Sequence, residues 1–368
     1  MKVVLAFDSF KETMSSLEVA NITKEELLKK YKDIDVTIIP ISDGGEGSLD
    51  AISYSNDVSK LFFEVTGPHF ERIVSSIINI DGDFYIESAD VVGFKYKKEG
   101  DSPKMLTTYG IGELIKKALD YNPKSISICL GGTITNDGGL GMLSALGLKC
   151  YDNLGQEFIP LGESLKDIEY IDSSNIDERI FNTKVYALMD VTNPLYGKNG
   201  ASYVFAKQKG ADDEEIRLLD EGLINLSDKA KIALSKDYSN EAGSGAAGGL
   251  GFACLAFLKA NNRSGIESIM DACNFNEHII NSDYVFTGEG RLDSQSFQGK
   301  AIMGIMNRVK KYNKKLIFVC GTISDENFEF DECIKGVYKT NYLNLDFQEA
   351  KLRCVEDLRK TINDIELD

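Results

Sequence analysis

The chain has 368 residues and a formal net charge of −17, from 58 acidic and 41 basic side chains. This acidity argues against nucleic-acid binding, because a phosphate backbone requires a basic face. Only two histidines are present, which excludes most histidine-based chemistry and makes a carboxylate the expected general base. At roughly 150 residues per domain, the length predicts about two domains.

Alternating strands and helices are predicted at both ends of the chain. Short apolar runs at 2–7 and 36–41 are typical of buried strands, and the helix between them begins at a capping box formed by Ser15 and Glu18. Near the C-terminus we expect strands at 284–287, 316–320 and 336–339, and helices at 301–311 and 347–365. Such alternation predicts a doubly wound parallel sheet with helices on both faces.

The middle of the chain has a different pattern. Apolar runs at 72–80 and 83–88 flank Gly82 and predict a hairpin, and glycine-rich stretches and separate helices follow. We therefore expect an α/β fold in which residues 1–66 and 283–368 form one discontinuous Rossmann- or flavodoxin-like domain. Residues 67–282 would form a second α/β domain inserted into it, and the active site would lie in the cleft between the two.

The cysteines and the apolar runs indicate where the protein resides. The seven cysteines form no C-x-x-C pair and are odd in number, which is typical of reduced thiols rather than of a disulfide frame or a zinc site. The uncharged run at 242–258 holds several glycines and is shorter than a membrane span. We expect a cytoplasmic protein that does not bind membranes.

Glycines cluster in stretches at 44–47, 131–147, 243–251 and 288–290. Glycine lets the backbone approach a ligand closely and adopt a positive φ. Each stretch also contains acidic, amide or hydroxyl side chains, and most of the stretches follow a predicted strand or precede a helix. In open α/β sheets ligands bind at such positions, although tight turns alone would account for a single stretch.

Residues Gly243 to Gly248 match the pattern G-x-G-x-x-G, which makes a nicotinamide-dependent oxidoreductase an alternative. Residues 236–242 are polar, however, whereas the dinucleotide fingerprint follows a buried strand. The loop before a predicted helix at 246–258 could bind an anion or could serve close helix packing, and both interpretations remain open. A Walker A motif is absent, because Lys300 is followed by Ala301. A non-catalytic module that binds an anion is a further alternative, which the many carboxylates beside the glycines disfavour.

Several motifs, taken in order, resemble the bacterial type 1 glycerate kinases from residue 1 to about residue 325. The motifs are Asp8-Ser9-Phe10-Lys11, Pro40-Ile41-Ser42-Asp43-Gly44-Gly45-Glu46-Gly47, Thr107-Thr108-Tyr109-Gly110, Gly131-Gly132-Thr133-Ile134-Thr135-Asn136-Asp137-Gly138-Gly139, Asp190-Val191-Thr192-Asn193-Pro194-Leu195, Gly200-Ala201, Gln208-Lys209-Gly210-Ala211, Gly245-Ala246-Ala247-Gly248-Gly249, Gly288-Glu289-Gly290-Arg291-Leu292-Asp293-Ser294-Gln295 and Gly299-Lys300. The chain departs from the family pattern at Glu12-Thr13, Ser42, Ile302 and at Gln298, where a His is common.

The resemblance implies a kinase that transfers a phosphoryl group from ATP, with Mg²⁺, to D-glycerate and forms 2-phosphoglycerate in organic-acid catabolism. A glycerate 3-kinase, or a kinase for a related small hydroxy acid, is the alternative within this class. The expected partners are ATP and D-glycerate, and a homodimer is one assembly to consider.

Asp190 is the candidate base, because it follows the apolar run 185–189 and precedes the turn that Asn193-Pro194 predicts. Asp293 is the second candidate, and an Asx-turn is the structural alternative for Asp190. Lys11 and Arg291 are the catalytic cations, and Arg291 is expected to bind the glycerate carboxylate. Asp43 and Asp137 are candidate metal ligands or helix caps. The remaining candidates for binding substrate or nucleotide are Asp8, Ser9, Gly44, Gly45, Gly131, Thr133, Asn136, Asn193, Gly245, Gly248, Gly288, Glu289 and Lys300.

Overall fold

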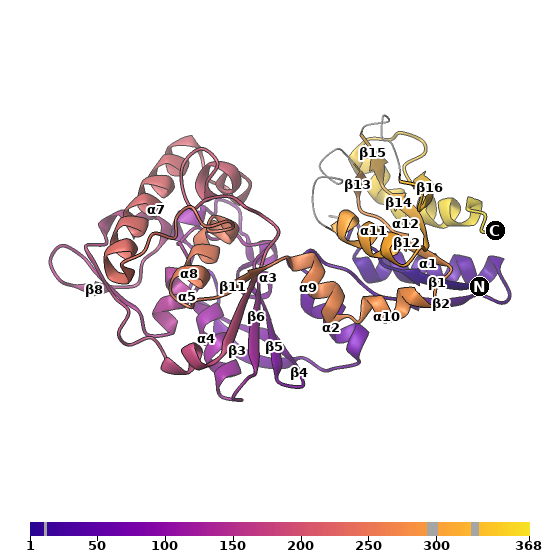
Figure 1. Ribbon diagram of the computed structural model, residues 1–368. Coiled ribbons are helices and arrows are strands. Elements are labelled where there is room, and N and C mark those ends of the chain that lie inside the picture. Colours follow the sequence, from indigo (N-terminus) through magenta and orange to yellow (C-terminus); the bar gives the residue numbers. More distant parts are fainter. Residues whose placement is uncertain (11–12, 293–300, 325–330) are drawn as a thin grey trace. The chain divides into compact units, whose positions relative to one another are not determined.

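The computed structural model describes residues 1–10, 13–292, 301–324 and 331–368 (Figure 1). The chain divides into two compact units. The first unit comprises residues 1–43, 50–57 and 266–368, and the second unit comprises residues 44–49 and 58–265. Both are built from helices and largely parallel sheets, which confirms the α/β class.

The boundaries of the two units differ from the expected positions at 66/67 and 282/283. Strand β3 (Leu61–Thr66) pairs antiparallel with β4 (Arg72–Ile80), so it belongs to the sheet of the second unit. Helices α9 (Gly265–Ala272) and α10 (Phe275–Ile280) lie almost wholly in the first unit. A strand's sequence shows that it is buried but not which sheet it joins, so both boundaries were misplaced.

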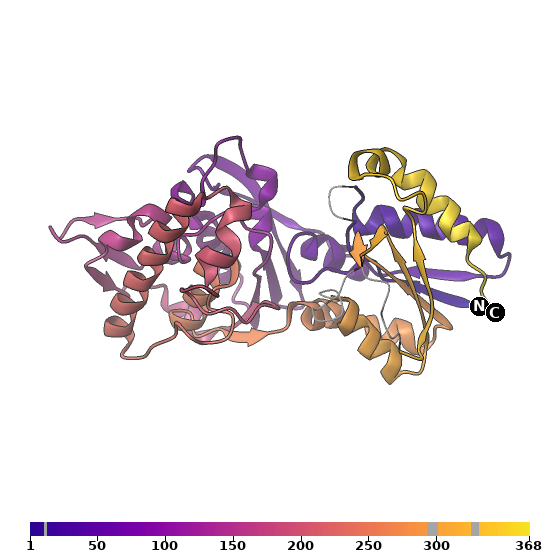
Figure 2. The same cartoon turned by 90° about the horizontal axis from the view of Figure 1, so that it is seen from above.

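The sheet of the first unit is parallel throughout, with the order β16-β14-β12-β1-β2. This is the flavodoxin-like order of a doubly wound sheet. Helices α1 and α12 lie on one face and α11 on the other (Figure 2). The elements of this unit, besides α9 and α10, are β1 (Lys2–Leu5), α1 (Ser16–Lys30), β2 (Asp35–Ile38), α2 (Ser48–Asn56, which begins in the second unit), β12 (Tyr284–Thr287), β13 (Arg291–Leu292), α11 (Ala301–Lys311), β14 (Lys315–Cys320), β15 (Thr322–Ile323), β16 (Ile334–Lys339) and α12 (Phe347–Asp364).

Local sequence signals explain these elements. Strand β1 buries Val3, Val4 and Leu5 almost completely, because helices cover both faces of a parallel sheet. The capping box predicted for α1 is present: Glu18 N donates to Ser15 Oγ at 3.3 Å, and Ser15 N donates to the Glu18 carboxylate at 2.7 Å. These two bonds satisfy N–H groups that the first turn of the helix leaves without partners.

The strand order of the first unit reverses between β1 and β12. Asp8 follows β1 and Gly288 follows β12, and Asp8 N donates a hydrogen bond to Gly288 O at 3.0 Å. The loops that follow the two strands therefore begin side by side. In open α/β sheets this switch point is where ligands bind. The sheet topology therefore positions the loops 8–10 and 288–291 for binding.

The sheet of the second unit has the order β11-β10-β6-β5-β4-β3. Strands β11, β10, β6 and β5 are parallel, and β4 is antiparallel to both of its neighbours. Ile80 pairs with Asp83 across a turn at Asp81 and Gly82, both with positive φ, which confirms the predicted hairpin. The other elements are β5 (Asp83–Glu87), α3 (Ser88–Val92), α4 (Tyr109–Leu119), β6 (Ser125–Cys129), α5 (Leu140–Ala145), β7 (Lys149–Tyr151), β8 (Glu157–Phe158), β9 (Tyr170–Asp172), β10 (Lys184–Leu188), α6 (Lys207–Lys209), α7 (Asp213–Leu234), α8 (Leu250–Ala256) and β11 (Asn261–Arg263).

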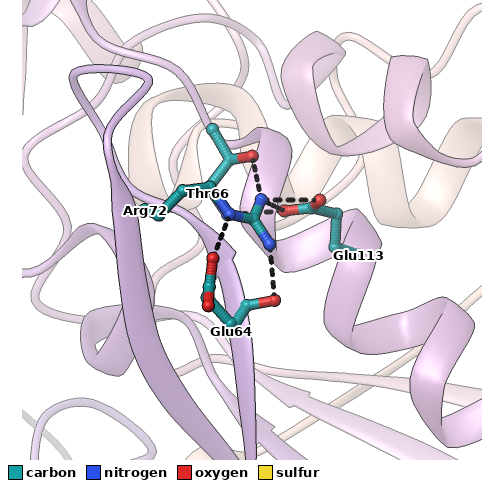
Figure 3. Close-up of polar contacts among 4 residues, drawn as sticks. All are labelled: Glu64, Thr66, Arg72 and Glu113. Carbon is teal, nitrogen blue, oxygen red and sulfur yellow. Dashed lines mark hydrogen bonds and ion pairs between the residues drawn. The ribbon is translucent and has the colours of Figure 1, made fainter.

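A polar cluster fastens helix α4 to strands β3 and β4 of this sheet (Figure 3). Arg72 donates to the carboxylates of Glu64 at 3.0 Å and Glu113 at 3.1 Å and to Thr66 Oγ1 at 3.0 Å. Glu113, on α4, also accepts a hydrogen bond from Thr66 N. The cluster fixes the start of α4, where Thr108 contributes to the site described below.

Substituting Phe286, which is fully buried in β12, tests the core of the first unit. We expect Phe286→Ala to lower the free energy of unfolding by about 3–5 kcal/mol, because it removes a buried ring and leaves a cavity. Leu352→Ala on α12 is the control, since Leu352 is 89% exposed, and it should change stability by less than about 0.5 kcal/mol. Urea unfolding followed by circular dichroism measures both. Equal effects would contradict the assigned core.

Candidate active site

Loops at the switch point of the first unit line a cavity of about 510 Å³. Asp8 and Ser9 follow β1, and Glu289 and Arg291 follow β12; all four line the cavity. Ser9 N donates to Asp8 Oδ1 at 2.6 Å, which fixes the direction of this carboxylate. Four of the residues predicted from the sequence are therefore brought together.

Arg291 is an exposed cation at this cavity, and its Nε donates to Ser324 Oγ at 2.7 Å. That bond helps to orient the guanidinium at the cavity. Lys11, Asp293 and Lys300, which the sequence analysis also singled out, lie outside the described residues.

Much of the cavity wall comes from the end of β16 and the start of α12, a segment that the sequence analysis did not single out. Topology could have indicated it, because β16 is parallel to β12 and ends at the same edge of the sheet. The lining residues from this segment are Thr340, Asn341, Leu345, Phe347, Ala350, Lys351, Cys354 and Asp357.

In the second unit, the glycine loop 44–49 is held at the carboxyl edge of the sheet. Glu87, which ends β5 and is nearly buried, accepts hydrogen bonds from Gly47 N at 3.0 Å and Leu49 N at 2.9 Å. A Cβ at Gly131, just after β6, would lie 2.6 Å from Gly45 Cα, so two backbones meet there with no room for a side chain. The predicted residues Gly45 and Gly131 are thus in contact.

Gly44 approaches a third loop at the same edge. Its φ is +85°, and a Cβ there would lie 2.9 Å from Gly265 Cα, next to the end of β11. Only glycine combines this backbone conformation with this approach. The loops after β5, β6 and β11 are therefore gathered around the glycine loop 44–49.

Asp190 stands at the carboxyl edge of the second sheet, two residues after β10, and its side chain is partly exposed. Its Oδ1 accepts hydrogen bonds from Ser264 Oγ at 2.8 Å and Gly265 N at 3.1 Å. Strand β10 lies between β6 and β11, so Asp190 shares this edge with Gly131 and Ser264. The structure thus orients the candidate base, and it adds Ser264, for which the sequence gave us no signal.

The loop 131–139 closes over a buried lysine. Lys209 is 3% exposed, and its Nζ donates to Thr135 O at 2.7 Å and Thr133 Oγ1 at 3.3 Å. Asn136 is fully buried and donates to Ser202 Oγ at 3.2 Å. Thr133 and Asn136 therefore contribute to the interior of this loop, and their contact with a ligand stays a prediction. Burial lowers the pKa of Lys209 to about 7, although the charge of Asp137 acts to raise it.

Asp137 is wholly buried and serves as the anchor of the same loop. Its carboxylate accepts hydrogen bonds from Thr108 N and Oγ1, both at 2.8 Å, and from Gly139 N and Gly141 N at the start of α5. Burial raises the pKa of Asp137, and the bonds from Thr108 oppose that rise. This arrangement matches the capping alternative and not a metal ligand, because the oxygens are turned to internal donors.

Asp43, the other candidate metal ligand, is exposed. Within the described ranges, no group of three His, Cys, Asp or Glu side chains is arranged to hold a metal ion. Magnesium does not require three protein ligands, because it is commonly bound by one or two carboxylates together with phosphate oxygens and water. Asp43 fits that requirement and Asp137 does not.

The loop 243–248 packs against its own unit and follows no strand. Gly245 N donates to Asn193 O at 2.9 Å, and a Cβ at Gly245 would lie 2.2 Å from Pro194 O. A Cβ at Gly248 would lie 2.2 Å from Thr135 O. Instead of a helix at 246–258, a 3₁₀ turn at Ala246–Gly249 precedes α8, because Ala247 and Gly248 have positive φ. Gly245 and Gly248 therefore have packing roles, and the basis for a nicotinamide site is lost. For Asn193 a contact with a ligand stays a prediction.

The thiols and the helices show no further functional feature. All seven cysteines are free, and burial raises the pKa of Cys150, Cys254 and Cys320 to about 12. Among the helices of the described ranges, none combines the length and the apolarity that crossing a membrane requires.

The two units together carry an oriented carboxylate, glycine loops with backbone N–H groups and a cavity with an arginine, the parts that phosphoryl transfer needs. These features define a small-molecule kinase on an α/β fold. Residues 3–367 match the model of the glycerate kinase family, so the chain belongs to that family. It is an enzyme, a kinase that transfers a phosphoryl group.

Relatives of this family align over most of the chain. Glycerate 2-kinase from Escherichia coli K12 is 41% identical over 330 residues, 89% of this chain and 86% of the relative. Glycerate kinase from Bacillus cereus is 38% identical over 99% of this chain and 97% of the relative. A crystal structure described as "putative glycerate kinase 2" from Salmonella typhimurium LT2 has a TM-score of 0.83 and 37% identity, with 99% of this chain and 96% of that chain covered.

The pKa of Lys209 leads to a prediction about pH. Between pH 7 and about 10 the unfolded chain holds a proton on this lysine that the folded chain lacks, so the contribution of Lys209 to stability rises with pH. We expect wild type to gain stability relative to Lys209→Met from pH 6.5 to 9.5, by urea unfolding. A difference that is constant or falls with pH would contradict the buried, readily deprotonated lysine.

Proposed function

We propose that this protein phosphorylates D-glycerate with ATP and releases 2-phosphoglycerate and ADP. Family membership and the relative named glycerate 2-kinase support the substrate and the position of the phosphate. The observation that carries the proposal is the carboxylate of Asp190, which Ser264 and Gly265 hold at the carboxyl edge of the second sheet.

In this proposal Asp190 is the general base. It takes the proton of the C2 hydroxyl while that oxygen bonds to the γ-phosphorus of ATP, and the bond between the γ-phosphorus and the bridging oxygen breaks to release ADP. The bond from Ser264 fixes the carboxylate, so little reorganisation is needed when the proton moves. Asp293, the second candidate, remains a prediction from the sequence.

The cations and loops serve the anionic substrates. We assign Arg291 to the glycerate carboxylate, because its guanidinium lines the cavity and suits a carboxylate. The backbone N–H groups of the loops at Gly44, Gly45 and Gly131 are proposed to bind phosphate oxygens. Lys11 and Lys300 are proposed as further cations from the sequence alone.

Magnesium would be held by Asp43 together with phosphate oxygens of ATP. When bound, it would neutralise charge on the phosphates during transfer. Asp43 is exposed, as a carboxylate that meets a metal carried in by a nucleotide must be. The enzyme is further proposed to be cytoplasmic. A homodimer stays a prediction, which sedimentation would check.

Asp190→Asn should lower turnover at least about 1,000-fold, because the amide cannot accept the proton, while circular dichroism and the unfolding midpoint stay near wild type. Release of ADP in the presence of glycerate and Mg-ATP measures this. Ser264→Ala is the matched variant: it removes the hydroxyl that donates to Asp190 Oδ1 and should cost about 10-fold. Near-normal turnover of Asp190→Asn would assign the base to another residue.

The position of the phosphate is tested by coupling the reaction to enolase. Enolase acts on 2-phosphoglycerate and not on 3-phosphoglycerate, so we expect phosphoenolpyruvate to form at once without phosphoglycerate mutase. A product that enolase consumes only after the mutase is added would identify a glycerate 3-kinase. ADP release with a different hydroxy acid, but not with glycerate, would exclude both activities.

A further inference from the structure

We propose that the cavity of the first unit binds the nucleoside part of ATP, with its base against the start of α12. This inference rests on the proposed function, which supplies ATP as the phosphoryl donor. It assigns a ligand to the segment from the end of β16 to Asp357 in α12, which lies beyond the sequence motifs described above. The argument uses the size of the cavity, its apolar wall and its charges.

The size of the cavity matches a nucleoside and exceeds what glycerate needs. Binding cavities for drug-sized ligands range from roughly 300 to 1,000 Å³, and this one measures about 510 Å³. A three-carbon acid would leave most of that space to water. The cavity also lies at the β1/β12 switch point, where doubly wound sheets bind their ligands.

The wall of the cavity is substantially apolar. Its apolar side chains come from the loop after β1 and from the start of α12: Phe10, Met14, Leu345, Phe347, Ala350 and Cys354. Glycerate carries oxygen on every carbon and has no surface to place against them. A planar base does, and burying apolar surface and stacking on an aromatic ring both favour binding. Phe347 is 50% exposed without a ligand, so a base could remove more of its apolar surface from water.

The charges of the wall favour the uncharged part of the nucleotide. Among the described lining residues, three are carboxylates, Asp8, Glu289 and Asp357, and two are cations, Arg291 and Lys351. The carboxylates disfavour phosphate groups beside them, and they can accept hydrogen bonds from ribose hydroxyls and from an amino group on a base. Asp357 is 2% exposed and is held by Arg353 at 2.9 Å, so its direction is fixed. Arg291 and Lys351 are the cations of the described lining and can attract the phosphate groups that the nucleoside carries.

Two substitutions on one helix test the proposal. Ala350→Trp places an indole in the cavity and should raise KM for ATP at least about 10-fold, with little change in KM for D-glycerate. Leu352→Trp adds the same ring two residues away on a side chain that is 89% exposed, and it should leave both constants near wild type. A folded Ala350→Trp protein with an unchanged KM for ATP would overturn the proposal.

A chemical readout does not depend on turnover. Cys354 lines the cavity and is partly exposed, whereas Cys333 is partly exposed and is not among the lining residues. With iodoacetamide and peptide mass spectrometry, ADP and adenosine should each slow the alkylation of Cys354, and D-glycerate should not. The rate at Cys333 is the internal reference. Protection by glycerate alone, or by neither nucleoside ligand, would overturn the assignment.

The two experiments separate failure of this inference from failure of the proposed function. If no ADP forms with glycerate, the proposed reaction is wrong, and protection of Cys354 by ADP still reports on the cavity. If ADP forms but neither KM for ATP nor the alkylation rate responds, the reaction holds and the nucleoside binds elsewhere.

Discussion

Parallel strand pairing is the constraint on which the sites depend. Parallel strands deliver all their carboxyl ends to one edge of a sheet, and loops that are distant in sequence meet there. In the first unit the ends of β1 and β12 bring Asp8 beside Gly288. In the second unit the ends of β5, β6, β10 and β11 gather Glu87, Gly131, Asp190 and Ser264. Without this common direction the acids and glycine loops would be scattered.

Close approach of the backbone is the second requirement, and glycine meets it at the points of contact. Gly131 and Gly45 meet with no space for a Cβ, and Glu87 then fixes the glycine loop 44–49 through two backbone N–H groups. These loops also address an electrostatic problem, because a protein of charge −17 must bind two anionic substrates. Backbone N–H groups can supply local positive potential without changing the net charge, and Arg291 places a cation at the cavity.

The sequence predicted those features that depend on local signals. The capping box of α1, the Asp81-Gly82 turn and the helix at 301–311 follow from neighbouring residues, and the structure has all three. The placement of β3 was missed, because an apolar run does not state which sheet it joins. The G-x-G-x-x-G match was also misleading, since Gly245 and Gly248 satisfy packing contacts with residues far away in sequence.

The parts of the site that carry local sequence signals could be predicted, and the other parts could not. Asp190 and the glycine loops carry recognisable patterns. Ser264 does not. Lys209 stands in a recognisable motif, but nothing near it in sequence shows that a loop some seventy residues earlier covers it. The β16–α12 wall of the cavity was missed because its residues are ordinary for a strand end and an amphipathic helix. They become a wall only because the fold places them around the same cavity as the loop after β1.

The central claim is that Asp190 acts on bound substrates as the base and does not serve to bind them. The most direct measurement is single-turnover transfer of phosphate from γ-labelled ATP to D-glycerate by Asp190→Asn, with the affinities for both substrates measured on the same protein. We expect affinities within about twofold of wild type and a transfer rate lower by at least about 1,000-fold. Transfer at a near-normal rate, or a loss of rate that follows a loss of binding, would contradict the claim.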